Sequence, residues 1–457
     1  MKIKKIEFVK HEVFKTHTVV FGDTNIPNTT FLVGNNGSGK TKILDIIYYA
    51  LFQPHGHPGN YEVIITILFS DEEKTNLALI ENEINYTIKK EDGRNSHSVK
   101  SKSGTDISLN LQDLSKVVYS TIEVNFNEPN INSVTSRNID DMIKPKERSQ
   151  NLSTEIPQLL IDIKNLDDAD IAKWHKDNKK GYMGPFPPVG TRLERFTNAF
   201  HKIYDGEKTF SDIKNIGGLK KIIFTDSKGE EISLNDLSTG EKQVIYRVGY
   251  ILKNLGNISG GIILIDEPEI SLHPMWQMKL KDFLFEIFKD YDVQIIIATH
   301  SPYIFKNLDE NKEACIKIDR SKPESKKVSM IFPNVPYSPS VNLINYLAYG
   351  IFDELLHIEL YTLLQIREKR DKVTNSWNKS TNSLNQDGIE GWLQDSSGGN
   401  IAIEKTFIRT GKTTQTSETI MTWIRNKIHH ANESARPNFT SVDLKKSIDK
   451  MIELLQK

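Results

Sequence analysis

The sequence feature that most constrains the fold is GNNGSGKT at residues 34–41, a complete G-x-x-x-x-G-K-[ST] pattern between the apolar stretch TTFLV and the amphipathic stretch TKILDIIYYALF. In such a loop the glycines let backbone N–H groups surround an anion, and the following helix adds the positive end of its dipole. Lys40 then faces the β- and γ-phosphates, and Thr41 offers a hydroxyl to Mg²⁺. The pattern predicts a strand–loop–helix phosphate site formed by Asn35, Asn36, Gly37, Ser38, Gly39, Lys40 and Thr41.

The stretch IILIDEPEISLHP at residues 262–274 supplies a second part of such a site. Its four leading apolar residues predict a buried strand, whose carboxyl end presents Asp266 and Glu267 at the edge where α/β sheets bind ligands. Asp266 is expected to hold Mg²⁺, and Glu267 to orient or deprotonate an attacking water. A surface acidic pair that merely caps a strand does not explain why both acids follow a wholly buried run.

Two further stretches have an ordinary structural interpretation when taken alone, and a functional interpretation when they lie beside a phosphate site. LNDLSTGEKQ at residues 234–243 reads as a helix start, with Ser238 or Thr239 as the N-cap and Glu241 in the first turn. A helix start with free N–H groups and a hydroxyl also binds phosphate. In IIIATHSP, His300 ends a predicted buried strand; a lone histidine there is usually structural, but next to a nucleotide it is a candidate sensor of the γ-phosphate.

Length and composition limit the class of protein. A chain of 457 residues is expected to form about three structural units, and 37% hydrophobic with 26% charged residues argues against wholesale disorder. No apolar run approaches the roughly 20 residues that cross a membrane, and the first residues show no secretory signal. The single Cys315 fits a reducing cytoplasm. The net charge of −1 gives no sign of nucleic-acid binding, although local basic stretches such as IKPKER leave it open.

Hydrophobic periodicity divides the chain further. The first 35 residues are expected to form strands of a short antiparallel meander, and GIILID and QIIIATH to form buried parallel strands separated by a helix. From residue 341 the pattern turns helical, with a polar linker at 371–400 and closing helices at 416–431 and 442–457. The predicted segments are an N-terminal lobe at 1–127, a helical or irregular insertion at 128–215, a C-terminal lobe at 216–340 and an α-helical domain at 341–457.

Together and in this order, the four motifs resemble those of ABC-type ATPases over about residues 1–335. Lys40 and Thr41 match Walker A, residues 237–243 the signature, Asp266 and Glu267 Walker B, and His300 the switch histidine. The resemblance implies an α/β head: a mixed β-sheet with a P-loop core, an antiparallel β subdomain, a helical insertion and a C-terminal α-helical domain. Glu123 or Asn125 are candidates for the Q-loop contact, and an adenine contact is expected near residues 14–17.

The same resemblance implies a mechanism that uses ATP and Mg²⁺, with Glu267, His300 and Lys40 as catalytic residues. Two chains would join head to tail, so that ATP on the Walker A of one is capped by Ser238 and Gly240 of the other. The signature departs from the common L-S-G-G-Q, because Thr239 replaces a glycine and Glu241 replaces the glutamine. This departure bears more on the hydrolysis rate than on binding.

The stretch DEPEISLHP is similar to that of SMC-like and overcoming-lysogenisation-defect ATPases (AAA_15- or AAA_21-like), not to that of transporters. Residues 128–212 contain no long coiled coil, and no Toprim-like acidic constellation follows the ATPase motifs. The chain therefore resembles compact ATPases of bacterial anti-phage defence, such as the ATPase subunits of the Septu system and retron effectors. That resemblance implies a cytoplasmic homodimer or higher homo-oligomer, an effector nuclease encoded nearby and no membrane partner.

The stretch MTWIRNKIHH near the end resembles part of a HEPN domain, with Arg425, Asn426 and His430 in the matching positions. The histidine could act as acid or base on an RNA 2′-hydroxyl, while Arg425 stabilises phosphorane charge. On a straight helix Arg425 and His430 lie about 140° apart, whereas Arg425 and His429 share a face. Either the helix breaks near Ala431, or His429 is the partner. The alternative is a helical module for dimerisation or partner docking.

The sequence is compatible with three functions. The first is an ATP-hydrolysing dimer that gates an effector nuclease in anti-phage defence. The second is an ATP-gated ribonuclease acting through its own C-terminal domain. The third is a nucleotide-dependent scaffold with little hydrolysis.

Overall fold

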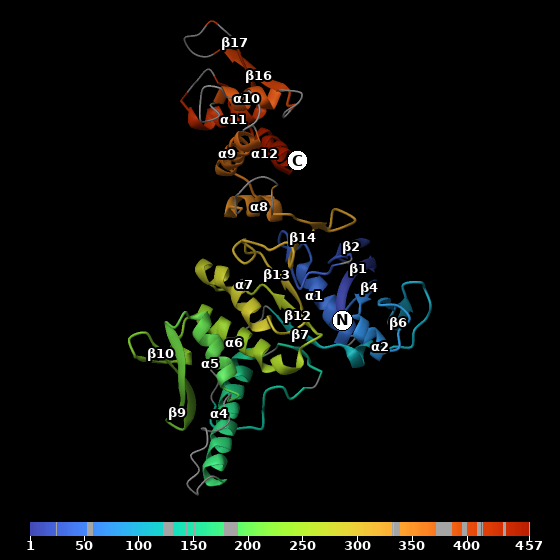
Figure 1. The fold of residues 1–457 in the computed structure, drawn as a ribbon, viewed down its shortest axis with the longest axis vertical. Coiled ribbons are helices and arrows are strands. Elements are labelled where there is room, and N and C mark those ends of the chain that lie inside the picture. Colours follow the sequence, from blue (N-terminus) through green and yellow to red (C-terminus); the bar gives the residue numbers. More distant parts are fainter. Residues whose placement is uncertain are drawn as a thin grey trace. The chain divides into compact units, whose positions relative to one another are not determined.

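The structure is a computed structural model (Figure 1), and its chain divides into two compact units, Met1–Val328 and Ser329–Lys457. The finer division into four segments stays a prediction. The structure describes residues 1–23, 25–52, 58–121, 131–142, 144–149, 151–177, 191–330, 332, 339–371, 386–394, 400–408, 413, 415–432 and 436–456.

The first unit is built around a seven-stranded sheet with the order β15-β14-β3-β13-β12-β7-β8. Its strands are β3 (Thr29–Val33), β7 (Val117–Ser120), β8 (Lys146–Arg148), β12 (Ile262–Asp266), β13 (Gln294–Ala298), β14 (Glu313–Lys317) and β15 (Lys326–Lys327). All neighbours are parallel except β14 and β15. Every residue of β3, β12 and β13 is buried, as expected for central strands covered on both faces. The predicted buried parallel strands are therefore confirmed.

A second, antiparallel sheet has the order β2-β1-β4-β5-β6. Its strands are β1 (Lys2–His11), β2 (His17–Val20), β4 (Tyr61–Leu68), β5 (Glu83–Glu91) and β6 (Arg94–Ser101). The predicted meander of the first three strands is wrong, because β3 joins the parallel sheet while β1 pairs with β2 and β4. Helix α1 (Lys40–Phe52) contributes to one hydrophobic core shared by the two sheets. The short helices α2 (Asp71–Asn76) and α3 (Leu111–Leu114) complete this part.

The rest of the first unit is a set of helices and a small sheet (Figure 1, green and yellow). The helices are α4 (Leu152–Asp177), α5 (Glu194–Ile203), α6 (Thr239–Lys253) and α7 (Pro274–Phe288), with single 3₁₀ turns at Leu234–Asp236 and Leu255–Asn257. The sheet comprises β9 (Lys208–Ile216), β10 (Leu219–Asp226) and β11 (Glu231–Ser233), in the order β11-β10-β9. Helix α6 connects this sheet to the strand β12 that carries Asp266, so both predicted motifs lie on regular elements.

The second unit is mainly helical around a core that includes Leu360, Trp423 and Ile448. It contains α8 (Val341–Tyr349), α9 (Glu354–Asp371), α10 (Gln386–Gln394), β16 (Ile403–Ile408), β17 (Gln415–Thr419), α11 (Ile420–His429) and α12 (Ser441–Gln456). The predicted helix at 416–431 is shorter, because residues 415–419 pair with β16 as a strand. The predicted linker at 371–400 also contains α10.

The α/β fold class predicted from the sequence is confirmed by this architecture. Among the described residues, no helix combines the length and the apolar character that a membrane crossing requires.

Candidate nucleotide-binding site

The loop between β3 and α1 has a conformation that requires its glycines. Gly39 has φ +101°, and a Cβ atom there would lie 2.4 Å from Phe14 Cζ. Gly34 has φ +144°, and its Cβ would lie 2.7 Å from the Ile318 carbonyl oxygen. In the described part of the chain, the buried Ser38 hydroxyl has no hydrogen-bond partner. A curled loop with a buried unsatisfied hydroxyl is suited to an anion that accepts hydrogen bonds.

Lys40 is buried at the centre of this loop, with 4% of its surface exposed. Its Nζ donates to the Gly34 carbonyl at 3.0 Å and lies 2.7 Å from His300 Nε2. Burial lowers the pKa of Lys40 to about 8, against the opposing effect of nearby carboxylates including Asp266. These two hydrogen-bond partners of the ammonium are neutral acceptors, which charged phosphate oxygens can replace.

Thr41 and Asp266 meet where α1 begins and β12 ends. The Thr41 hydroxyl donates to Asp266 Oδ1 at 3.2 Å, and the Tyr119 hydroxyl lies 3.5 Å from Oδ2. Burial raises the pKa of Asp266 to about 7, and the hydrogen bond from Thr41 opposes this shift. A hydroxyl beside a carboxylate is the oxygen donor set that Mg²⁺ takes in phosphate sites, so these two residues fit the predicted metal.

Glu267 and His300 lie side by side at the ends of neighbouring strands. Glu267 Oε1 is 3.4 Å from His300 Nε2, and Glu267 has φ +42°, an uncommon backbone conformation for a residue other than glycine. Burial and the charge of Lys40 lower the pKa of His300, although Glu267 opposes the shift. The structure thus brings Lys40, Thr41, Asp266, Glu267 and His300 together at the carboxyl ends of β3, β12 and β13.

Sequence reasoning missed two charged residues that support this group. Glu269 Oε1 accepts a hydrogen bond from the His300 backbone N–H at 2.6 Å, and burial raises the pKa of Glu269. Arg247 of α6 donates to the Asp266 carbonyl at 2.8 Å, and burial lowers the pKa of Arg247 to about 10. Each left a signal in the sequence: the third acid in DEPE, and one arginine inside the apolar run VIYRVGYIL.

The predicted signature turn is a well-formed helix start. Ser238 caps α6 in a capping box with Glu241, and Lys208 forms an ion pair with the same glutamate. A Cβ atom on Gly240 would lie 2.5 Å from the Ser271 carbonyl oxygen, so close packing within the chain demands glycine there. Among the described residues, no hydrogen bond or ion pair joins residues 238–240 to the loop at 34–41. One chain does not bring these two motifs together.

The structure places some of the remaining predicted contact residues, while others lie outside the residues it describes. Asn35 accepts the Ser38 N–H at 3.0 Å through its carbonyl, and Asn36 is exposed in the loop. Phe14, near the predicted adenine contact, is 2% exposed and stacks with Phe8 at 4.3 Å between ring centroids. The predicted Q-loop candidates at positions 123 and 125 lie outside the described residues.

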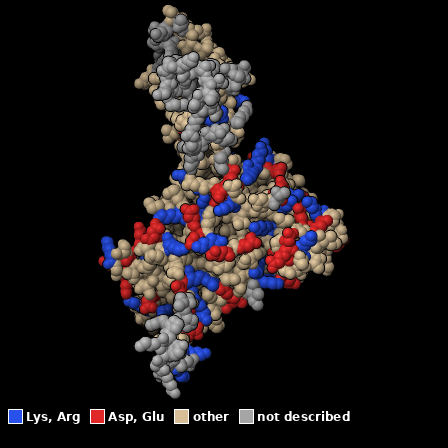
Figure 2. All heavy atoms as spheres, in the orientation of Figure 1, with Lys and Arg blue, Asp and Glu red and all other residues tan. Residues whose placement is uncertain are grey.

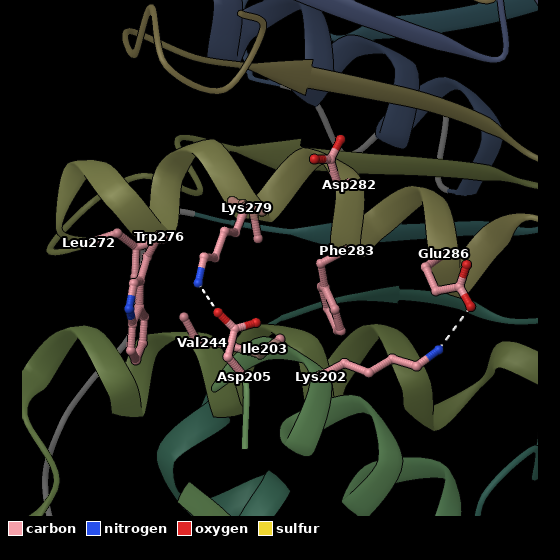
Figure 3. A pocket seen from close by; sticks show the side chains of 11 residues that line it. Lys202, Ile203, Asp205, Val244, Leu272, Trp276, Lys279, Asp282, Phe283 and Glu286 are labelled. Carbon is pink, nitrogen blue, oxygen red and sulfur yellow. Dashed lines mark hydrogen bonds and ion pairs between the residues drawn. The ribbon is translucent and has the colours of Figure 1, made fainter. Parts of the chain in front are cut away.

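An apolar pocket lies apart from the phosphate loop (Figure 3). Apolar side chains of α7 line it, including Trp276 and Phe283, and no residue of the loop at 34–41 is among its walls. Two ion pairs cross its rim, Lys279 with Asp205 and Lys202 with Glu286, the latter at 2.8 Å. These ion pairs tie α7 to α5 and the turn after it.

In the second unit, the predicted HEPN-like residues lie on α11. Arg425 Nη1 donates to Asn426 Oδ1 at 2.9 Å, and Asn426 is buried with its amide donating to Glu418 at 3.0 Å. The helix ends at His429, and His430 is the C-cap. Both histidines are exposed, and burial together with Arg425 lowers the pKa of His429. The arrangement leaves either histidine available, and a HEPN assignment stays a prediction.

Comparison with curated proteins gives three similar stretches. The chain is 34% identical over 146 residues to Septu protein PtuA of Bacillus thuringiensis, covering 30% of this chain and 35% of that protein. It is 39% identical over 85 residues to the "Retron Vc95 probable ATPase" of Vibrio cholerae serotype O1 biovar El Tor, and 31% identical over 96 residues to the "Retron Ec83 probable ATPase" of Escherichia coli. These cover 17% and 19% of this chain. The matches span 35%, 16% and 17% of the three relatives' lengths.

Among solved structures, the SMC head domain from Thermotoga maritima aligns with a TM-score of 0.38 and 17% identity over 72% of this chain and 100% of its own. An SmcHead bound to the C-winged helix domain of ScpA aligns with a TM-score of 0.44 and 16% identity, over 72% of this chain and 98% of its own.

One family model matches residues 29–306, which include the phosphate loop, the Asp266–Glu267 pair and His300. This match covers more than half of the chain, and a P-loop ATPase family implies ATP binding. The chain belongs to the AAA_21 family, described as "AAA domain, putative AbiEii toxin, Type IV TA system".

Proposed function

We propose that the chain binds and hydrolyses ATP with Mg²⁺, and that two copies close around two nucleotides to gate an effector nuclease in anti-phage defence. The observation that carries the proposal is the convergence of Lys40, the Thr41–Asp266 pair and the Glu267–His300 pair at one edge of the parallel sheet. Phosphate-binding, metal-binding and water-activating groups are all within reach of one triphosphate there.

Each residue has a role that follows from its contacts. Lys40 exchanges the Gly34 carbonyl for phosphate oxygens, and Thr41 with Asp266 holds Mg²⁺ once Asp266 is ionised. Glu267 orients or deprotonates the attacking water, and neutral His300 donates to the γ-phosphate. Bound Mg²⁺ supplies charge neutralisation on the phosphates.

The signature turn supports closure between two copies. Ser238 and Gly240 form a helix start suited to phosphate, yet they make no polar contact with the loop at 34–41 of their own chain. A second copy placed head to tail would lend that turn to the first copy's nucleotide. In this proposal ATP controls association, and the homodimer is the active assembly.

The defence role has its support in the curated relatives. The Septu protein PtuA and the retron ATPases align with stretches of this chain. On this similarity we propose that the chain belongs to a defence system of the same kind. A cytoplasmic effector nuclease encoded nearby is the partner proposed here. Figure 2 shows basic and acidic side chains interspersed over the face drawn of residues 1–328, which favours a protein partner for that face over a duplex-wide phosphate contact.

The test substitutes Glu267→Gln and measures two quantities: the rate of ATP hydrolysis, and the molar mass by light scattering after size exclusion. We expect hydrolysis to fall at least about 100-fold, because the water loses its base, while ATP now accumulates a stable dimer. Glu72→Gln, an exposed acid on α2, is the control and should match the unaltered protein. If Glu267→Gln hydrolysed ATP normally, the assignment of Glu267 to the attacking water would be wrong. If the unaltered chain bound ATP without hydrolysing it, the function would be that of a nucleotide-dependent scaffold.

A second candidate function is RNA cleavage by the end of α11. It is favoured by Arg425, which is held by Asn426 beside the exposed His429 and His430. A neutral histidine can act as a general base on a 2′-hydroxyl, and a nearby arginine can stabilise the charge of the phosphorane. The double substitution His429→Ala with His430→Ala should abolish cleavage of RNA by the ATP-loaded protein without changing ATP hydrolysis. Cleavage that survives both substitutions excludes this function.

A further inference from the structure

Gln277, in the first turn of α7, bridges two segments of the first unit. Its Nε2 donates to the Leu272 carbonyl at 2.8 Å, and its Oε1 accepts the Ser301 hydroxyl at 2.5 Å. Trp276 and other neighbours on α7 turn toward the pocket of Figure 3, whereas Gln277 is not among that pocket's walls. The amide therefore uses both its donor and its acceptor within the chain.

One end of this bridge sets the backbone next to His300. Ser301 follows His300 directly and is 5% exposed, and its hydroxyl also accepts the Tyr303 backbone N–H at 3.1 Å. Since a hydroxyl has one proton, Ser301 can donate one hydrogen bond, and it donates it to Gln277. Glu269 holds the His300 N–H at 2.6 Å, so the main chain of the switch histidine is fixed from two sides.

The other end reaches the turn that packs against the signature. Leu272 follows Ser271, which has φ +64°. The Ser271 carbonyl oxygen is the atom that a Cβ on Gly240 would approach to 2.5 Å. The turn at 238–240 and residues 271–272 therefore pack directly against each other, with no room for a side chain between Gly240 and Ser271.

We propose that Gln277 is a positioning residue that couples the Ser238 turn of a chain to His300 of the same chain. The inference deepens the proposed function and rests on it, because the Ser238 turn serves the nucleotide of one copy while His300 serves that of the other. Arrival of a neighbouring nucleotide at Ser238 shifts residues 271–272, and Gln277 passes the shift to His300. The two nucleotides of a dimer are then hydrolysed in a linked manner.

The test compares Gln277→Met, Gln277→Glu and Ser301→Ala in the full chain, with steady-state ATP hydrolysis as the readout. Gln277→Met removes both bonds, and Gln277→Glu keeps an acceptor for Ser301 but loses the donor to Leu272. Because His300 acts on the reacting phosphate, each variant should lower kcat about tenfold, the usual scale of one lost hydrogen bond, and leave KM for ATP unchanged. The double variant Gln277→Met with Ser301→Ala should lower kcat no more than Gln277→Met alone, since Gln277→Met already removes the bond to Ser301.

Gln112→Met is the matched control, because Gln112 also bridges two groups, the Ala50 carbonyl and the Tyr86 hydroxyl, away from His300. It should leave both kinetic constants unchanged. Normal kcat in Gln277→Glu, or multiplied losses in the double variant, would overturn the coupling. Should Gln277→Met fail to fold, Ser301→Ala and Gln277→Glu still decide the matter. An unaltered chain without hydrolysis would instead overturn the proposed function, and this inference with it.

Discussion

The Nζ atom of Lys40 lies 2.7 Å from Nε2 of His300, although the two residues are 260 positions apart in sequence. An ammonium group can only donate, so His300 Nε2 must accept, and the ring proton is on Nδ1. The imidazole is therefore neutral in this arrangement, in agreement with the lowered pKa of His300. When a phosphate draws Lys40 away, the ring proton has to move from Nδ1 to Nε2 before that nitrogen can donate to the phosphate. The contact thus links nucleotide arrival to the state of the histidine.

Binding of MgATP should depend on pH through Asp266. Burial raises the pKa of its carboxyl to about 7, so below that pH a proton competes with Mg²⁺ for the same oxygen atoms. We expect the affinity for ATP in excess Mg²⁺ to fall about tenfold per pH unit below 7. Titration calorimetry between pH 6 and 8 measures this, and the same titration in EDTA should show a much weaker dependence. Equal slopes with and without Mg²⁺ would contradict the assignment of Asp266 to the metal.

The stability of the free protein should also depend on this carboxyl. The folded pKa of Asp266, about 7, lies above the ordinary value of 3.8, so the folded state holds the extra proton between those values. The stability that this proton contributes is present below about pH 4 and lost as the pH rises through 7. Asp266→Asn does not titrate, so its free energy of unfolding relative to the unaltered protein should rise from pH 5 to pH 8 by a few kcal/mol at most, and its thermal midpoint should rise with it. Thermal scans in EDTA test this, and a constant difference would refute it.

Glu241 should restrain the signature turn. Its Oε2 accepts the Ser238 hydroxyl at 2.7 Å, so that proton is not available to a phosphate, and the carboxylate itself repels one. Glu241→Gln removes the charge and keeps a side chain that completes a capping box. ATP-dependent dimerisation should tighten several-fold, roughly the value of one hydrogen bond, when measured by sedimentation in the Glu267→Gln background. Glu231→Gln, which breaks the exposed pair with Lys214, is the control, and a weaker dimer in Glu241→Gln would oppose the prediction.

Part of the fold could be predicted because short-range signals and burial agree. The stretch TTFLV is wholly apolar or β-branched and precedes the glycine-rich loop, and IILI (262–265) and IIIA (295–298) are uninterrupted apolar runs. Short β-branched apolar runs are typical of central strands, so the parallel sheet and its phosphate loop could be predicted. Which strands pair with β1 was not predictable, because alternation identifies a strand but not its neighbour.

The rest of the site depended on long-range contacts. Arg247 stands out in the sequence only as one charge in an apolar run, and Gln277 only as one polar residue of a helix; the fold places them against the Asp266 carbonyl and the Ser301 hydroxyl. Likewise, residues 415–419 form strand β17 because they pair with β16. A local helical pattern does not reveal this pairing. Thr419 then caps α11. The first residue of this helix, Ile420, lies four residues after the predicted start at residue 416.

The second unit should depend strongly on one buried ion pair. Glu418 Oε2 lies 2.9 Å from Arg436 Nη1, the side chains are 4% and 1% exposed, and Glu418 Oε1 also accepts the Asn426 amide. Glu418→Gln leaves the buried guanidinium without this carboxylate, a change that costs about 3–5 kcal/mol. Glu404→Gln breaks the more exposed pair with Lys446 and should cost at most about 1 kcal/mol. Urea unfolding of both variants, followed by tryptophan fluorescence, measures the difference. Equal losses would mean that packing around Trp423, and not the Glu418 charge, holds the end of α11 in place.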